Sequence, residues 1–336
     1  MLQSIEQFIF RNLTPMSIRY LPAPDVAGAT GLPAEVYRQL EREFQTVPPI
    51  TMHHPDPGLM AGVWSACRET LVAGPDRSLK EAVAVAVSES NRCPYCIQAH
   101  TSFFEGSGGE AGGYREVIAW AAATGRRMGC PEVPKLPSAS VPAVLGTAVV
   151  FHYINRMVNI FLDDSMMPVI GKVPLLGDQA LRVFSSVVSG RIATIAVKPG
   201  EFLTPEPDLT LPDAFSWAKA DRLVAGGLLR FTEAARRAGA LIVPEVQDIV
   251  TQQVAMWNGD VPGLGKAWLD QLVGVLPERH RPQARIALLA AMASWTVDAG
   301  EIAAFRKTGG DDRALLDTAA WGAFLAAERV AGWMAT

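Results

Sequence analysis

Four side chains that can do chemistry lie within twenty residues of one another, in the segment EAVAVAVSESNRCPYCIQAH. They are Glu81, Cys93, Cys96 and His100. A cysteine thiolate is a nucleophile and a metal ligand, and a histidine exchanges protons near neutral pH. A carboxylate can take part in the same proton traffic. No other segment carries a comparable set of reactive groups, so this one is the candidate site.

The spacing of the two cysteines predicts a thiol pair that can form a disulfide. Pro94 follows Cys93, and proline favours the first position of a helix, so we expect Cys93 at the N-cap and Cys96 in the first turn. Two Cα atoms three positions apart on a helix lie roughly 5 Å from each other, which suits a disulfide. A helix N-terminus also favours the thiolate form of a cysteine. His100 lies one turn after Cys96 and shares its face.

The same residues could instead form a zinc site or a structural disulfide. Cys93, Cys96 and His100 would supply three zinc ligands, but no second C-x-x-C or H-x-x-x-H lies nearby to supply a fourth. A C-x-x-C loop is too short for a passive disulfide to stabilise the fold much. A redox-active pair is therefore preferred. Glu81 has its own alternative, because Ser78 and Glu81 form the S-x-x-E pattern of a helix capping box.

The pattern of a glutamate, eleven residues and then C-x-x-C-x-x-x-H resembles the AhpD-like alkylhydroperoxidases, within the wider carboxymuconolactone decarboxylase family. The flanking segments VYRQLEREFQTVPP, HTSFFEG and FHYINRMVNIF look similar too, so the resemblance covers roughly residues 35 to 165. Members of the decarboxylase branch lack the cysteine pair. The sequence departs from the best-known peroxidases at Tyr95, where they carry histidine, and this bears on the proton relay.

This resemblance implies an all-α fold and a thiol-dependent peroxidase that needs no metal or other cofactor. Cys96 would attack a small-molecule hydroperoxide, Cys93 would close the disulfide, and His100 with Glu81 would move the proton. A dithiol reductant of the lipoyl or thioredoxin type would then regenerate the pair. Two alternatives stay open. One is a non-redox enzyme in which Glu81 and His100 act as acid and base on a small organic acid, and the other is a non-catalytic redox-sensing or interaction protein.

The composition favours a soluble, cytoplasmic protein. The chain has 336 residues, enough for two domains, and 49% of them are apolar, enough for a sizeable core. The net charge of −4 and the lack of a basic run argue against a nucleic-acid partner. Four cysteines are too few for a disulfide-stapled secreted domain, and the N-terminus lacks the apolar core of a signal peptide.

The hydrophobic pattern predicts a series of helices in the first half of the chain. A short helix is expected at Ser4 to Arg11. The longer ones are expected at residues 34–44 and 58–73, after Glu81, from Pro94 to the glycines at 106–109, and at residues 114–124 and 140–162. The last of these carries His152, Asn155, Arg156 and Asn159 on one stripe, which is too polar for a membrane span. The stripe would line the thiol pocket or an interface, or be a buried hydrogen-bonded group without chemistry.

Three sites outside this segment have simpler interpretations. Adjacent His53 and His54 in a turn are expected to be solvated or to cap a helix. Cys67 is expected to be a small core residue. Cys130 lies in a loop and is expected to be a bystander.

The second half shows a weak repeat of the first at an offset of 201 residues. Gly108–Gly109 then aligns with Gly309–Gly310, and Ala119–Trp120 with Ala320–Trp321. On this register Ser294, Val297 and Glu301 stand where the first half has Cys93, Cys96 and His100, and Pro282 stands where it has Glu81. We therefore predict two tandem AhpD-like domains, residues 1–175 with the site and residues 176–336 as a degenerate copy. We also expect the chain to form a homo-oligomer, and residues 163–177 and 201–212 to be linkers or loops.

Overall fold

The structure, a computed structural model, describes residues 14–166, 195–263 and 265–334. These residues form helices joined by loops, and no β-strand occurs among them apart from one isolated bridge between Ile18 and Leu162. The predicted all-α fold is confirmed. The helix expected at Ser4 to Arg11 and most of the expected linker after residue 163 lie outside the described residues.

Between residues 14 and 166 the chain forms α-helices at the positions that the hydrophobic pattern predicts, and one short helix, α3, that it did not predict. They are α2 (Gly31–Glu43), α3 (Pro48–Thr51), α4 (Pro57–Cys67), α5 (Arg77–Ser90), α6 (Pro94–Gly106), α7 (Arg115–Ala123) and α8 (Val141–Phe161). The later part forms α10 (Arg222–Gly239), α11 (Pro244–Met256), α12 (Ala267–Val273), α13 (Arg281–Met292), α14 (Ala299–Lys307) and α15 (Asp312–Met334). Residues 201–212 are a loop, as predicted.

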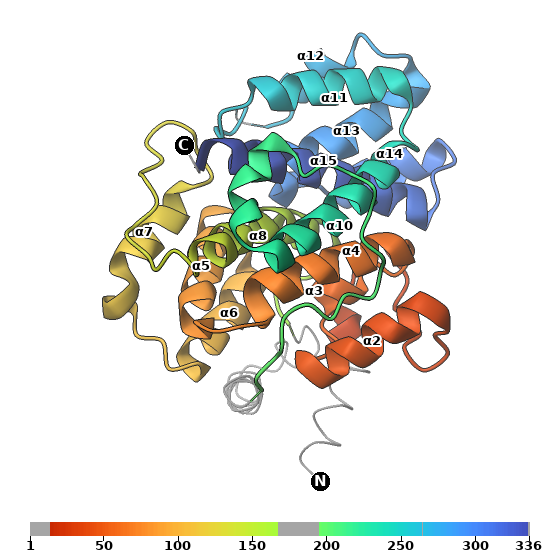
Figure 1. Ribbon diagram of the computed structural model, residues 1–336. Coiled ribbons are helices and arrows are strands. Elements are labelled where there is room, and N and C mark those ends of the chain that lie inside the picture. Colours follow the sequence, from red (N-terminus) through yellow and green to blue (C-terminus); the bar gives the residue numbers. More distant parts are fainter. Residues whose placement is uncertain (1–13, 167–194, 264, 335–336) are drawn as a thin grey trace, which may run out of the picture.

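Helix α8 runs through the middle of the molecule (Figure 1). Helices α5 and α6 pack on it from the first half, and α15 packs on it from the second. It is long and apolar enough to cross a membrane by length and composition, but other helices of the same chain bury most of it. Its polar stripe therefore faces protein rather than lipid or water, with His152 and Asn155 wholly buried.

Helices α5 and α6 form the frame of the candidate site. The alternating Ala and Val residues of α5 are helical, and Val83, Ala84 and Val87 are wholly buried. The chain then turns through Arg92, whose φ is +54°. Cys93 caps α6 with Pro94 in its first turn, which confirms the predicted start of this helix.

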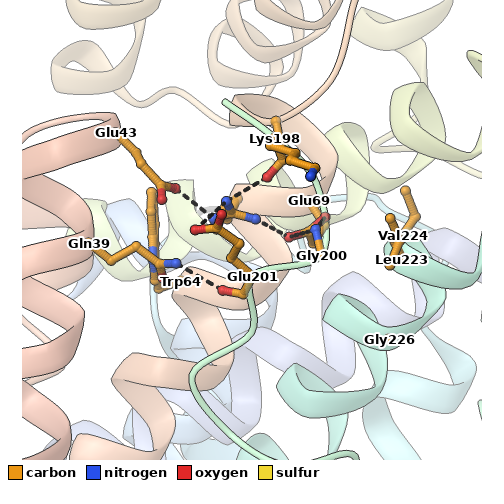
Figure 2. Close-up of polar contacts among 12 residues, drawn as sticks. Gln39, Glu43, Trp64, Glu69, Lys198, Gly200, Glu201, Leu223, Val224 and Gly226 are labelled. Carbon is orange, nitrogen blue, oxygen red and sulfur yellow. Dashed lines mark hydrogen bonds and ion pairs between the residues drawn. The ribbon is translucent and has the colours of Figure 1, made fainter. Parts of the chain in front are cut away.

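A buried cluster of charges joins the two halves. Helix α4 continues into a short π-helix, η2 (Arg68–Val72), and its Arg68 Nε donates to Glu43 at 2.6 Å. The same guanidinium donates to Glu69 at 2.5 Å and to the carbonyl of Lys198 at 2.7 Å. Glu69 in turn accepts from the backbone N–H of Gly200 (Figure 2). The segment before α10 is therefore held on the first half by one buried cation and two buried carboxylates.

The turn after α6 recurs in the second half. Gly108 and Gly309 both have positive φ, +81° and +91°, in the left-handed region that glycine adopts without strain. The next glycine of each turn packs against the ring of Phe104 or Phe305, so closely that a Cβ atom would clash with it. These pairs are separated by the predicted offset of 201 residues. The boundary between residues 175 and 176 lies outside the described residues, so the division into two domains stays a prediction.

We predict that Arg68→Met destabilises the protein strongly. It would leave Glu43 and Glu69 buried without their cation, which costs about 3–5 kcal/mol. Urea unfolding measured by circular dichroism should show a lower midpoint. The matched control is Arg42→Met, because Arg42 also pairs with Glu43 but its side chain is 60% exposed, so its loss should cost less than about 1 kcal/mol. Equal effects of the two variants would contradict a structural role for the buried cluster.

Candidate active site

Glu81 lies at the centre of the candidate site and is wholly buried. Its Oε2 is 2.6 Å from Nδ1 of His100, which reaches it from α6. Its Oε1 accepts from Nε of Arg77, one turn earlier on α5, at 2.7 Å. The structure thus brings together two residues that the sequence singled out, Glu81 and His100, and adds Arg77, which the sequence did not indicate.

The capping-box alternative for Glu81 is wrong. Asp76 precedes the helix, and Ser78 Oγ bonds the hydroxyl of Tyr114 at 2.7 Å. The Glu81 carboxylate is bound by Arg77 and His100 instead. The residues had the spacing of a capping box, S-x-x-E, but contacts with Arg77 and with His100 of another helix determine what the Glu81 carboxylate binds.

The Glu81 carboxylate stays ionised although it is buried. Burial alone would raise its pKa, but the Arg77 guanidinium and the His100 ring outweigh burial and hold the pKa below its usual value. A carboxylate that accepts a proton-bearing Nδ1 leaves Nε2 of His100 as the nitrogen that can exchange a proton. The His100 ring is fixed by edge contacts with Phe103 and Phe151, whose centroids lie 5.2 and 4.6 Å from its own.

The two cysteines at the start of α6 are free thiols and almost wholly buried, with Cys93 0% and Cys96 1% exposed. Burial, together with a hydrogen bond between the two side chains, raises the pKa of Cys93 well above its usual value. The expectation that the helix N-terminus favours both thiolates is therefore wrong for Cys93, because burial outweighs the helix dipole there. Cys93 therefore keeps its proton at neutral pH.

Cys96 and His100 open onto one apolar cavity. The empty space in and around this cavity, with the open solvent at its mouth included, is about 640 Å³. Apolar side chains from several helices form its wall, among them Phe44, Ile50, Leu71, Phe103, Phe151 and Ile154. Val47 and Pro49 also line it, and both are half-buried. A space of this kind fits an uncharged organic molecule better than an ion.

Two further side chains face this cavity. Tyr95 is buried, and burial and then Cys96 raise its pKa, so its phenol keeps the proton. Cys67 lines the same cavity, and burial raises its pKa to about 12. The expectation that Cys67 is a small core residue fits its burial and its pKa, but nothing near it in the chain indicated that it would share a cavity with Cys96. Cys130 is half-buried in a loop.

The polar stripe of α8 lies behind the thiol pair rather than in the cavity. Asn155 bonds the side chains of Asn91 and Ser88, each at 3.0 Å. Its amide also lowers the pKa of Cys93, against the larger effect of burial. His152 bonds Asn91 at 3.1 Å and Thr124 at 2.9 Å. The stripe is thus a buried hydrogen-bonded group that affects one cysteine.

The interpretation of His53 as a solvated or capping residue is wrong. Its ring is wholly buried, with Nδ1 3.1 Å from the Ile50 carbonyl and Nε2 2.9 Å from the hydroxyl of Tyr153. Burial lowers its pKa to about 4, so the ring is neutral. His54 is half-buried in the same turn.

Comparison with known proteins agrees with this geometry. The model of the carboxymuconolactone decarboxylase family matches residues 58–130, the segment with Glu81 and the cysteine pair. Alkyl hydroperoxide reductase Rv2159c of Mycobacterium tuberculosis is 34% identical over 328 residues, which cover 93% of each chain. The present chain therefore belongs to the carboxymuconolactone decarboxylase family. No solved structure matches it.

We predict that Arg77→Met shifts the pH dependence of the site. Without the guanidinium, burial dominates and the pKa of Glu81 rises. The carboxylate would then be protonated at higher pH. The pH below which Cys96 loses its reactivity should therefore rise. The rate of alkylation of Cys96 by iodoacetamide, followed against pH by mass spectrometry, measures this. Arg77→Lys keeps the charge and should shift less, and an unmoved acid limb in Arg77→Met would rule out this role of Glu81.

Proposed function

We propose that this chain is a thiol-dependent peroxidase that reduces organic hydroperoxides through a Cys93–Cys96 dithiol–disulfide cycle. The observation that carries the proposal is the position of Cys96 and of a Glu81-bound His100 on one apolar cavity. The similarity over nearly the whole chain to a protein named alkyl hydroperoxide reductase supports it.

In the first step, His100 takes the proton of the Cys96 thiol, and the thiolate attacks the O–O bond of the hydroperoxide. The bond breaks, one oxygen stays on sulfur as sulfenic acid, and the other leaves as an alkoxide. His100 returns the proton to this alkoxide, so an alcohol is released. The ionised Glu81 carboxylate stabilises the imidazolium that exists between the two transfers.

In the second step, Cys93 condenses with the Cys96 sulfenic acid to a disulfide and water. An external dithiol then reduces this disulfide by two thiol exchanges. Both sulfurs are almost wholly buried, so the donor must carry its thiols on a group narrow enough to enter the cavity. Burial therefore favours a lipoyl-type donor over a thioredoxin, whose thiols lie on a broad protein surface.

The second half has a different chemistry at the corresponding position. Glu301 stands where the first half has His100, and both its carboxylate oxygens bind Arg285, with Lys266 3.0 Å from one of them. This is an ion-pair cluster, and the chain has no cysteine after Cys130 that could form a second thiol pair. We propose that this half is a degenerate copy that completes the packing around α8.

We predict sustained loss of cumene hydroperoxide when the reduced protein is mixed with excess dihydrolipoamide. Peroxide assay beside the Cys96→Ser variant tests it, since that variant should lose all turnover. Cys93→Ser should stop after one turnover, with sulfenic acid on Cys96 that dimedone traps. Cys130→Ser is the matched control and should keep full activity. Absence of turnover in the unmodified protein would reject the peroxidase proposal, and activity that survives loss of both cysteines would favour the acid–base alternative.

We also predict that the cavity selects for organic peroxides. Burial of a cumyl group contributes roughly 25 cal/mol per Å² of apolar surface, so kcat/KM for cumene hydroperoxide should exceed that for hydrogen peroxide by at least about tenfold. Leu71→Asn places an amide on the cavity wall and should lower the value for cumene hydroperoxide only. Hydrogen peroxide serves as the internal control, and an equal fall for both substrates would count against a binding role of the wall.

A further inference from the structure

We infer that a pocket between Arg92, Trp268 and Trp295, the Arg92 pocket, is a second binding site whose ligand is a small aromatic carboxylate. This pocket shares no lining residue with the cavity onto which Cys96 and His100 open. The inference therefore concerns a separate site and does not depend on the peroxidase activity.

The Arg92 pocket lies between two turns that correspond to each other in the two halves of the chain. Arg92 comes from the turn that directly precedes Cys93. At the offset of 201 residues its counterpart is Ala293, which also lines the pocket, together with Trp295 and Thr296. The empty space in and around the pocket, with the open solvent at its mouth included, is about 960 Å³. The first half thus contributes a cation to this space, and the second half contributes aromatic surface.

Helix α8 ties the two turns together. Its Asn159 donates to the carbonyl of Asn91, next to Arg92, and to Ser294 Oγ, each at 3.1 Å. Ser294 begins the short helix η6 (Ser294–Thr296), which carries one of the two indoles. The walls of the pocket are therefore in place before a ligand arrives, and a preformed site loses less conformational entropy on binding.

Arg92 supplies the charge that a ligand would meet. Its side chain is exposed, and its guanidinium forms no ion pair and no hydrogen bond with the residues that the structure describes. The guanidinium lies over the Trp295 ring, with Cζ 4.9 Å from the ring centroid. Such a contact holds the cation in place and leaves its N–H groups available. An arginine fork binds a carboxylate through two parallel hydrogen bonds, so this cation indicates a carboxylate ligand.

The other cation in the wall, Lys266, is already neutralised. Its Nζ lies 2.8 Å from Asp298 Oδ2 and 3.0 Å from Glu301 Oε1. Glu301 also accepts from Arg285. Among the described residues that line the pocket, Arg92 is therefore the one cation left for a ligand, which fits a single negative charge.

The aromatic part of the ligand follows from the two indoles. Trp268, on α12, and Trp295 are both half-buried, so part of each side chain remains open to the pocket. Ring pairs in offset or edge-to-face contact gain stability beyond the burial of their apolar area. A flat ring would therefore gain more from these walls than an aliphatic chain of equal size.

The backbone at Arg92 agrees with a task for its side chain. Its φ is +54°, in the left-handed region that glycine adopts without strain and an arginine does not. The conformation of the turn thus does not explain why an arginine stands here. Recognition of a ligand through the guanidinium would explain it.

The test is isothermal titration calorimetry of the full chain with cinnamate and with cinnamamide, which has nearly the same shape and no charge. We expect cinnamate to bind with a Kd below about 1 mM. Cinnamamide should bind at least about tenfold more weakly, because it cannot form charge-assisted hydrogen bonds with Arg92. Absence of cinnamate binding, or equal affinities for the two compounds, would overturn the inference. This comparison uses the unmodified protein, so it does not depend on whether a variant folds.

Four variants locate the site. Arg92→Met should weaken cinnamate binding at least about tenfold, and Trp268→Leu about threefold or more. The matched controls are Arg115→Met and Trp217→Leu, an exposed arginine and a half-buried tryptophan that line neither the Arg92 pocket nor the cavity of Cys96. Both should bind cinnamate within about twofold of the unmodified protein. Circular dichroism checks that each variant folds, and equal affinities of Arg92→Met and Arg115→Met would reject the site.

Leu71→Asn separates this pocket from the cavity of Cys96. Leu71 lines that cavity and not the Arg92 pocket, so the variant should bind cinnamate within about twofold of the unmodified protein. Weaker binding by Leu71→Asn, with unchanged binding by Arg92→Met, would place cinnamate in the cavity of Cys96 and contradict the inference. No thiol takes part in this measurement, so failure of the peroxidase proposal would leave its result unchanged.

Discussion

The candidate site depends on one buried carboxylate that remains charged. Glu81 has no contact with water, and it stays ionised because Arg77 and His100 both bind it. Arg77 is supplied by the same helix, one turn away, whereas His100 comes from α6. The two helices must therefore pack in a fixed register, and this register carries Cys96 to the cavity together with His100. An uncompensated charge at this depth would be too costly to keep, so the site and the packing of α5 on α6 depend on each other.

Local chemistry explains which parts of this arrangement could be predicted from the sequence. Cys93–Pro94 specifies the start of α6, since a proline without an N–H fits the first turn of a helix and few other places. The spacing of Cys96 and His100 then puts them on one face. These properties depend on a few neighbouring residues, and they are the ones that the structure confirms.

The predictions that were wrong concern burial and long-range contacts. The expected thiolate at Cys93 rested on the helix dipole, but part of what surrounds this residue comes from α8, more than fifty positions away. His53 looked like a turn residue because its hydrogen-bond partner, Tyr153, lies one hundred positions later in the sequence. Arg77 carries no motif, and only the position of the Glu81 side chain shows its importance.

Two buried arginines hold the halves of the molecule together in different ways. Arg68 is neutralised by the carboxylates of Glu43 and Glu69. Within the described residues Arg156 has no such partner, and it bonds backbone carbonyls and lies 5.5 Å from the centroid of the Trp257 ring. Burial lowers the pKa of Arg156 to about 10, so it is still a cation at neutral pH. Arg156 therefore joins α8 to the second half through the carbonyl of Ala291.

The narrow apolar cavity affects how readily the Cys96 sulfur would be irreversibly oxidised by excess peroxide. A sulfenic acid on Cys96 is lost to the sulfinic and sulfonic forms only when a second peroxide reaches it, and both products are anions. An anion on the Cys96 sulfur would have to sit against Phe103, Phe151 and Ile154 with little water to solvate it. Cys93 meanwhile interacts with the same cysteine, since Cys96 contributes to the raised pKa of the Cys93 thiol. The geometry thus resists irreversible damage on two grounds, and a protein with it would tolerate peroxide doses that silence thiols exposed on a surface.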